Sequence, residues 1–428
     1  MTNIITRNLQ RARTYAGLLR QTAGQVAQIN EAVRQVDRRI SAIHDRIDAI
    51  PGSPGRQPEE GLVLPSTEIA AHGGEDSFRI PKFWEPNFWE PTVQIALRDY
   101  CRPGDVVFDV GANAGGLSLI MSRHVGPRGV VCSFEASPRI IDKTHYNLVN
   151  GGCTNVYLSY RAVYHTSHEL VTMYPGTHLN DSIYNDYGAE GGASYEVETL
   201  ALDDFVAASG LMPSFIKMDI EGAEYDALKG AANILKDGKP GLILEQSPGD
   251  MRCHELLTEA GYVAIDLGNY RHIKSAADFD EGVGITNILF IHKDKAAADP
   301  YVNASAPVEV MHLSPEAFTR QPNGSLSLTE HVELPRGRYL CKAHFTAAGT
   351  DNEIFAGIDS NRGRLFRYHT YTQLMAANYT DWVFSLRSTS KVTPYIQFLN
   401  GKDDTFDWKG ATLYRFESFD SITPPVLF

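Results

Sequence analysis

The sequence predicts a multidomain chain with three structural parts: an N-terminal coiled-coil helix over residues 1–50, a Rossmann-like α/β domain over residues 78–296, and a jelly-roll-like β-sandwich over residues 308–428. Three observations support this division. Apolar residues recur at heptad spacing before residue 50, apolar strands alternate with helical stretches in the middle of the chain, and the helical period disappears after Val308. Residues 51–77 and 297–307 are predicted to be linkers, because prolines and small residues interrupt the pattern there.

The N-terminal helix carries the apolar seam of a coiled coil. Apolar residues follow one another in alternating steps of three and four at Val26, Ile29, Val33, Val36, Ile40, Ile43, Ile47 and Ile50. We therefore expect a homo-oligomer through residues 26–50, and the isoleucines favour a trimer. An amphipathic helix that packs on the α/β domain is the alternative. Residues 1–25 contain arginines but no acidic residue, so contact of this segment with a membrane surface is a further alternative.

The overall charge and the cysteines limit the partners and the compartment. A net charge of -13 and a pI near 5.5 argue against a protein that coats nucleic acid, so no nucleic-acid partner is expected. The cysteines are widely spaced, without a Cys-x-x-Cys pair, and indicate neither a disulfide framework nor a zinc site. Because no continuous apolar run reaches membrane-spanning length, the sequence indicates a cytoplasmic protein, with attachment to the inner face of the membrane as the alternative.

The middle of the chain has the pattern of a doubly wound sheet, in which short apolar strands alternate with helical segments. Its predicted strands are Val106–Val110, Gly129–Glu135, Asn155–Val163, Phe215–Asp219, Leu242–Glu245 and Ile288–His292.

A glycine-containing turn follows the first of these strands and is the first candidate ligand site. The segment Asp109-Val-Gly-Ala-Asn-Ala-Gly-Gly116 leads directly into the apolar-periodic helix Leu117–His124. Glycines remove side chains where the backbone turns tightly and approaches a ligand, and the N–H groups of the new helix favour an acidic ligand group. The pattern alone also fits a dinucleotide site or a tightly packed turn.

Glu135, at the end of the second strand, is the candidate partner for a ribose. A carboxylate at this position can accept hydrogen bonds from both hydroxyls of a bound nucleoside, including one of NAD. The alternative is a carboxylate that caps the helix after Ser137-Pro138.

The fourth strand carries the most specific motif. The string Ser214-Phe-Ile-Lys-Met-Asp-Ile-Glu-Gly-Ala-Glu224 resembles the signature of the FkbM-type methyltransferases. Other pieces of that family follow in order: Asp109-Val-Gly-Ala-Asn113, Phe134-Glu-Ala-Ser-Pro138, Val197–Phe205, Leu242-Ile-Leu-Glu245 and Gly261-Tyr262. The resemblance covers about residues 100–293 and implies a class I fold that takes a methyl group from S-adenosylmethionine and transfers it to a hydroxyl, often on a sugar of a cell-surface polysaccharide or a glycosylated metabolite.

The resemblance also assigns roles to the residues that match it. Asp109, Gly111, Asn113 and Gly115 would hold the methionine part of the cofactor, Glu135 its ribose, and Arg161-Ala-Val163 its adenine. The remaining implied cofactor contacts are Ala112, Ala136, Ala162 and Asp219. Asn113 stands where many methyltransferases have the second loop glycine, which makes a nicotinamide site less favoured.

The candidates for the reacting centre lie at the strand ends and in the loop Tyr174–Gly192. The predicted catalytic residues are Asp219, Glu245 and His178, and the predicted substrate contacts are Lys217, Glu221, Asn180 and Asp181. Two roles for the carboxylates stay open: a general base, or ligands of a divalent cation such as Mg²⁺ held by Asp219 and Glu245. Lys217 has the alternative role of pairing with one of these acids, and Glu224 that of a first-turn acid favoured by the helix dipole.

Alternatives stay open for the role of the C-terminal domain and for the function of the whole chain. Predicted strands Arg338–Phe345, Trp382–Leu386, Tyr395–Leu399 and Thr412–Phe416 carry aromatic residues that could stack on sugar rings or simply fill the core. The domain is therefore either a glycan-binding module or a structural one. For the chain, the alternatives to a methyltransferase are a non-catalytic oligomeric scaffold and an NAD-dependent sugar oxidoreductase.

Overall fold

The computed structural model describes residues 90–176, 181–184, 194–279, 285–322, 325–347, 353–360, 363–371, 379–386, 388–398 and 406–419. The chain divides into two compact units, Met1–Glu60 and Gly61–Phe428, and all described residues belong to the second. The predicted coiled coil and the linker 51–77 lie outside the described residues, so the trimer stays a prediction. In the described ranges, none of the helices combines the length and hydropathy needed to span a bilayer.

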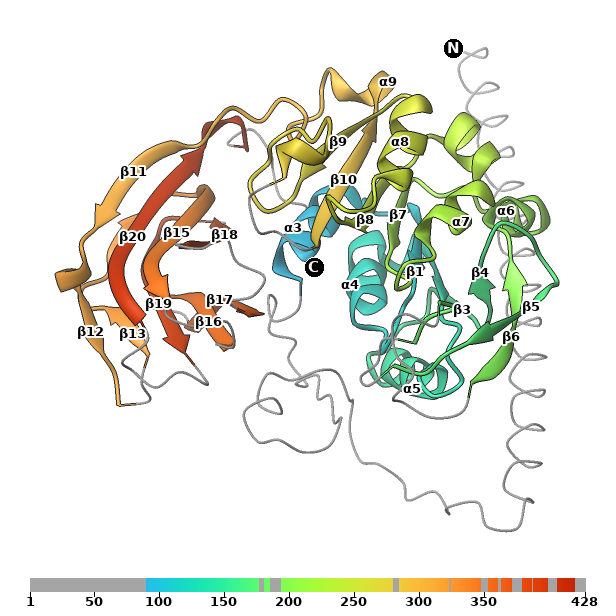
Figure 1. The fold of residues 1–428 in the computed structure, drawn as a ribbon, viewed down its shortest axis with the longest axis horizontal. Helices are drawn as coiled ribbons and strands as arrows, with labels where there is room; N and C mark the ends of the chain where they lie inside the picture. Colours follow the sequence, from blue (N-terminus) through green and yellow to red (C-terminus); the bar gives the residue numbers. More distant parts are fainter. Residues whose placement is uncertain are drawn as a thin grey trace, which may run out of the picture. The chain divides into compact units, whose positions relative to one another are not determined.

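A seven-stranded sheet forms the centre of the α/β domain, with the strand order β3-β2-β1-β7-β8-β10-β9 (Figure 1). Its strands are β1 (Val106–Val110), β2 (Val130–Phe134), β3 (Val156–Ser159), β7 (Phe215–Met218), β8 (Gly241–Gln246), β9 (Tyr262–Asp266) and β10 (Thr286–His292). Neighbouring strands are parallel except for β10, which is antiparallel to both β8 and β9. The apolar runs of the sequence predict these strands because both faces of such a sheet are buried.

Two predictions for this sheet need correction. Residues 155–163 were expected to form one strand, but Tyr160 and Arg161 interrupt it, so that β3 is followed by a separate β4 (Ala162–Val163). β4 belongs to a small second sheet with β6 (Tyr195–Leu200) and β5 (Leu170–Met173). Strand β9 was not predicted at all, although its residues are almost all buried.

Helices cover both faces of the central sheet and pack on two apolar cores. One core receives α3 (Pro91–Tyr100) and α4 (Gly116–Val125). The other receives α6 (Leu202–Ser209), α7 (Glu224–Lys229) and α8 (Arg252–Glu259). The remaining helices are α5 (Ile141–Asn150) and α9 (Lys293–Ala296). Because side chains alternate along a strand, Val107 and Phe215 point toward α3 and α4, and the polar residues Asp109 and Lys217 point to that same face.

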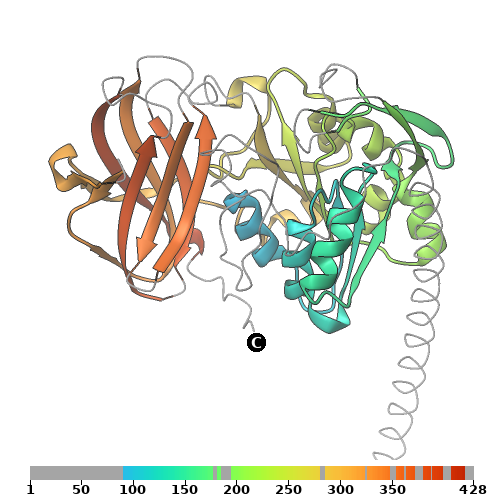
Figure 2. The same cartoon turned by 90° about the horizontal axis from the view of Figure 1, so that it is seen from below.

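The C-terminal domain consists of antiparallel strands in two sheets, which Figure 2 shows face to face. The first sheet contains β11 (Val308–Leu313), β20 (Phe406–Phe416), β15 (Gly337–Ala347) and β18 (Tyr379–Leu386). The second contains β12 (Phe318–Arg320), β13 (Leu326–Leu328), β14 (Val332–Leu334), β19 (Ser390–Phe398), β16 (Glu353–Ser360) and β17 (Gly363–Tyr371). Both sheets contribute to one apolar core, which includes Trp382. The jelly-roll-like character of the domain stays a prediction.

A buried ion pair joins the two domains. Arg338 on β15 donates to Asp99 on α3, and both side chains are 3% exposed. Tyr301 donates to Asp99 over 2.8 Å and accepts from Arg338 over 2.8 Å. Burial alone favours the neutral form of Asp99, but the charges of Arg338 and Arg98 outweigh it and hold the pKa of Asp99 below its ordinary value. Residues 297–307, predicted to be a linker, are therefore packed at this junction through Tyr301, which is 1% exposed.

Replacing Arg338 with Met should strongly destabilise the protein, because Asp99 would stay buried without its charged partner. We expect a loss of about 3–5 kcal/mol in the free energy of unfolding, measured by denaturant titration. The matched control is Lys409→Met, which removes the exposed pair of Lys409 with Asp407 and should cost less than about 1 kcal/mol. Equal losses in the two variants would contradict a structural role for the buried pair.

Candidate functional site

The glycine turn after β1 closely approaches the end of β7. Gly111 has a φ of 82°, and its N–H donates to the backbone oxygen of Phe134 over 2.9 Å. A Cβ atom at this position would lie 1.7 Å from the backbone oxygen of Asp219. Only glycine is compatible with this contact, since any side chain would push the turn away from Asp219.

Glu135 links that turn to the segment after β2. Its Oε2 accepts from the backbone N–H of Asn113 and its Oε1 from that of Ser137, each over 2.8 Å. The bond to Ser137 lies within a turn, because α5 begins only at Ile141 and has no side-chain cap, so the helix-capping alternative for Glu135 is wrong. Burial raises the pKa of Glu135 to about 7. Each carboxylate oxygen has a second lone pair, so Glu135 can also accept from a ligand hydroxyl.

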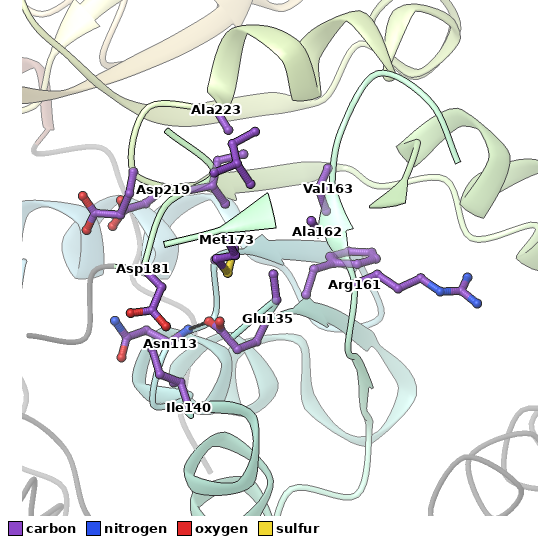
Figure 3. Close-up of a pocket in the computed structure, with 16 residues that line it drawn as sticks. Asn113, Glu135, Ile140, Arg161, Ala162, Val163, Met173, Asp181, Asp219 and Ala223 are labelled. Carbon is purple, nitrogen blue, oxygen red and sulfur yellow. Dashed lines mark hydrogen bonds between the residues drawn. The ribbon is translucent and has the colours of Figure 1, made fainter. Parts of the chain in front are cut away.

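A pocket opens between these two features at the carboxyl ends of the strands (Figure 3). Eight of the predicted cofactor contacts line it: Gly111, Asn113, Glu135, Ala136, Arg161, Ala162, Val163 and Asp219. Asp109, Ala112 and Gly115 lie outside this lining; Asp109 is 1% exposed and accepts from Ser118. The apolar lining residues that were not predicted are Phe134, Ile140, Met173, Ile183, Ile220 and Ala223. The guanidinium of Arg161 points away from the pocket, toward Glu198 at 3.5 Å.

The segment Asp181–Tyr184 contributes Asp181 and Ile183 to the pocket wall. Hydrogen bonds hold it to the residues that follow β2 and to those that follow β7. Asp181 accepts from Ser137 Oγ over 2.6 Å, from Arg139 Nε over 3.1 Å and also from Tyr195. Ser182 Oγ donates to the backbone oxygen of Glu221 over 2.8 Å. Asp181, predicted to contact substrate, is thus bonded mainly within the protein. His178 and Asn180 lie outside the described residues.

A cluster of carboxylates adjoins the pocket at Asp219. Oxygen atoms of Glu90, Asp219 and Glu245 all lie within 4.8 Å of one another. Lys217 Nζ lies 2.8 Å from Asp219 Oδ2 and 3.7 Å from Glu90 Oε2. Asp219 and Glu245 were predicted to meet because they end neighbouring strands, and the pairing of Lys217 with an acid was the expected alternative.

Glu90 is a member of this cluster that the sequence analysis missed. It precedes α3 in a left-handed conformation with a φ of 43°, and its Oε1 accepts from Asn287 Nδ2 over 3.2 Å. Asn287 is in turn the register partner of Glu245. Glu90 belongs to the second of two Phe-Trp-Glu-Pro strings, at residues 83–86 and 88–91, but the contacts that place it come from residues far along the chain.

The crowding of carboxylates shifts their ionisation. Burial, reinforced by the charge of Asp219, raises the pKa of Glu245 to about 9 and that of Glu221 to about 7. Burial also raises the pKa of Glu90. Near neutral pH Glu245 therefore carries a proton, while Asp219 forms the ion pair with Lys217.

Comparison with known proteins identifies the α/β domain. The family model described as the Methyltransferase FkbM domain matches residues 109–264. This part of the chain is an FkbM methyltransferase domain. Its cofactor is S-adenosylmethionine, as the sequence analysis expected. No curated protein matches the chain.

Several solved structures are similar to part of the chain. An FkbM methyltransferase from Methylobacillus flagellatus is 18% identical, with 44% of this chain and 43% of that one covered and a TM-score of 0.29. A precorrin-6y C5,15-methyltransferase from Geobacter metallireducens is 17% identical, with 48% and 88% covered and a TM-score of 0.29. Fibrillarin from Aeropyrum pernix, crystallised with S-adenosylmethionine, is 13% identical, with 46% and 73% covered and a TM-score of 0.28. The match thus spans less than half of the Methylobacillus protein.

The pocket fits S-adenosylmethionine in three respects. Gly111 forms part of the pocket wall with its backbone, Glu135 offers acceptor oxygens for ribose hydroxyls, and Ile140 with Ala162 provides an apolar wall for a base. Asp219 completes the pocket on the side of the carboxylate cluster and offers a negative charge to a cationic sulfonium.

Glu135→Gln should weaken the binding of S-adenosylmethionine at least about tenfold, because an amide offers only one acceptor atom in place of two. Isothermal titration calorimetry of the full chain measures this change. Glu196→Gln, at an exposed position on β6, is the matched control and should leave the affinity unchanged. Unchanged affinity in Glu135→Gln would contradict the assignment of Glu135 to the ribose. A wild-type protein that binds NAD instead would contradict the assignment of S-adenosylmethionine as the cofactor.

The raised pKa of Glu245 makes stability depend on pH. Between its ordinary value of 4.5 and about 9, the folded protein keeps this proton while the unfolded chain releases it, so the free energy of unfolding should fall as pH rises. Denaturant titrations at pH 6 and pH 9 should show a smaller fall in Glu245→Gln than in wild type, by up to about 1.4 kcal/mol per pH unit. Glu259→Gln, exposed at the end of α8, should behave as wild type; equal slopes in all three proteins would contradict the shift.

Proposed function

We propose that the protein is an O-methyltransferase that transfers the methyl group of S-adenosylmethionine to a hydroxyl of a sugar in a cell-surface polysaccharide or glycosylated metabolite. The observation that carries the proposal is the position of Asp219, which belongs both to the cofactor pocket and to the carboxylate cluster. A methyl donor and a proton acceptor can therefore meet at one strand end.

Methyl transfer to a hydroxyl has two requirements that the protein must meet. S-adenosylmethionine supplies an electrophilic methyl group when bound. The chain must orient the acceptor oxygen and accept the proton that leaves it as the new O–C bond forms. Asp219 is the proton acceptor in this proposal, because it is the carboxylate paired with Lys217 and exposed to the pocket, with 25% of its side chain accessible. Glu245 is already protonated near neutral pH and serves instead as a hydrogen-bond donor.

The polar residues beside Asp219 support a hydroxyl-rich acceptor. Asn287 Oδ1 is buried and accepts no hydrogen bond from any described residue, whereas the neighbouring Glu90 Oε2 faces Lys217 Nζ at 3.7 Å. Buried acceptors of this kind are costly unless a donor reaches them, and sugar hydroxyls are suitable donors. We further propose that the C-terminal domain contributes to acceptor choice, although Trp382 and Tyr395 are buried in it and unavailable for sugar stacking.

Asp219→Asn tests the proposal, since it keeps the shape of the side chain and removes the proton acceptor. Turnover should fall at least about 100-fold, while the affinity for S-adenosylmethionine should change only a few fold. Trideuteromethyl S-adenosylmethionine and mass spectrometry of glycan fractions locate the acceptor and measure the rate. Asp203→Asn, on α6 away from the pocket lining, is the control for a lost aspartate. Wild-type turnover in Asp219→Asn would refute the assignment, and methyl transfer to nitrogen would refute O-methylation.

A further inference from the structure

Lys217 is a buried side chain beside the carboxylate cluster. It lies on β7 opposite Asp109 of β1, with 3% of its side chain exposed. Its ammonium is 2.8 Å from Asp219 Oδ2 and 3.7 Å from Glu90 Oε2. Burial alone lowers the pKa of a lysine, but the carboxylates of Asp219, Glu90 and Asp109 outweigh it and raise the pKa of Lys217. The charged groups nearest to the Lys217 ammonium are therefore all carboxylates.

The acids around it outnumber the single ammonium, so they cannot all carry a negative charge at once. Glu90, Asp219 and Glu245 meet within 4.8 Å, and Asp109 lies beside Lys217 in the sheet. Like charges at such distances repel strongly in a medium of low polarity, so a cation or protons must hold the group together. In many proteins, a divalent metal ion fills this role among oxygen ligands.

We propose that the Lys217 ammonium is the resident cation of this carboxylate cluster, and that it positions Asp219 and Glu90 in the place of a divalent metal ion. The metal expected as one alternative from Asp219 and Glu245 is then not required. Lys217 then acts as a positioning residue in methyl transfer. This functional role rests on the methyltransferase activity proposed above.

The geometry allows either the Lys217 ammonium or a divalent metal ion at the carboxylate cluster, but not both. Mg²⁺ binds oxygen at about 2.0–2.1 Å, so an ion bridging Glu90, Asp219 and Glu245 would lie close to the ammonium that already contacts Asp219. Lys217 has no alternative solvent position, because its side chain is almost completely buried on the α3 face of the sheet. Binding a metal ion would therefore require the ammonium to lose its charge or the strand to move.

Binding of Mn²⁺ tests this proposal without any acceptor. Electron paramagnetic resonance should detect no Mn²⁺ bound at the cluster of the wild-type chain, and EDTA or Mn²⁺ should leave its melting temperature unchanged. Lys217→Met, which keeps the length of the side chain without its charge, should melt at a lower temperature, bind Mn²⁺ and regain part of the loss when Mn²⁺ is added. Lys236→Met, at an exposed position, should match wild type in every measurement.

Several outcomes would overturn the proposal. One is Mn²⁺ bound by the wild-type chain and lost in Glu90→Gln. Another is a folded Lys217→Met that melts with wild type or gains no Mn²⁺. If Lys217→Met does not fold, the comparison of wild type with Glu90→Gln still decides: Mn²⁺ lost in Glu90→Gln opposes the proposal, and a wild-type cluster without Mn²⁺ supports it. Failure of the methyltransferase assignment is recognised separately, by absent binding of S-adenosylmethionine.

Discussion

The ion pair of Asp99 with Arg338 removes two full charges from water at the junction of the domains. Such a pair is tolerated only where further interactions complete it: here Tyr301 donates a hydrogen bond to Asp99, and the Phe419 ring makes a cation–π contact 4.2 Å from the Arg338 guanidinium. The pair fixes the C-terminal end of α3. The other end of the same helix follows Glu90, so the anchoring of α3 acts together with the contacts to Lys217 and Asn287 in placing this carboxylate.

Few positive charges lie near the carboxyl groups of the site, and this limits how many of these groups are ionised. In the cofactor pocket and the adjoining cluster, burial raises the pKa of Glu135, Glu221 and Glu245, while Asp219 pairs with Lys217. A cationic methyl donor approaching such a site meets both a favourable field and carboxyl groups that can release protons in response. The site can thus receive positive charge although few of its carboxyl groups carry a full negative charge near neutral pH.

Much of the α/β domain could be predicted from the sequence, because its parallel strands are apolar on both faces and end in polar residues. Asp219 and Glu245 were expected to lie together since they end neighbouring strands. Glu90 could not be found in this way: the contacts with Lys217 and Asn287 that place it join segments far apart in the chain. Tyr301 was missed for a related reason, as the small residues around it predict a linker and only the fold brings Arg338 to it.

The family segment, residues 109–264, contains the whole described lining of the cofactor pocket but not the whole site. Glu90 enters from upstream and Asn287 from downstream. The pocket for the methyl donor is therefore encoded in one stretch of sequence, whereas the neighbouring cluster combines Asp219 and Glu245 of that stretch with Glu90 from outside it. Changes outside the family segment could alter the surroundings of the cluster without changing the pocket lining, which offers a simple route by which a common methyl-donor module acquires new acceptors.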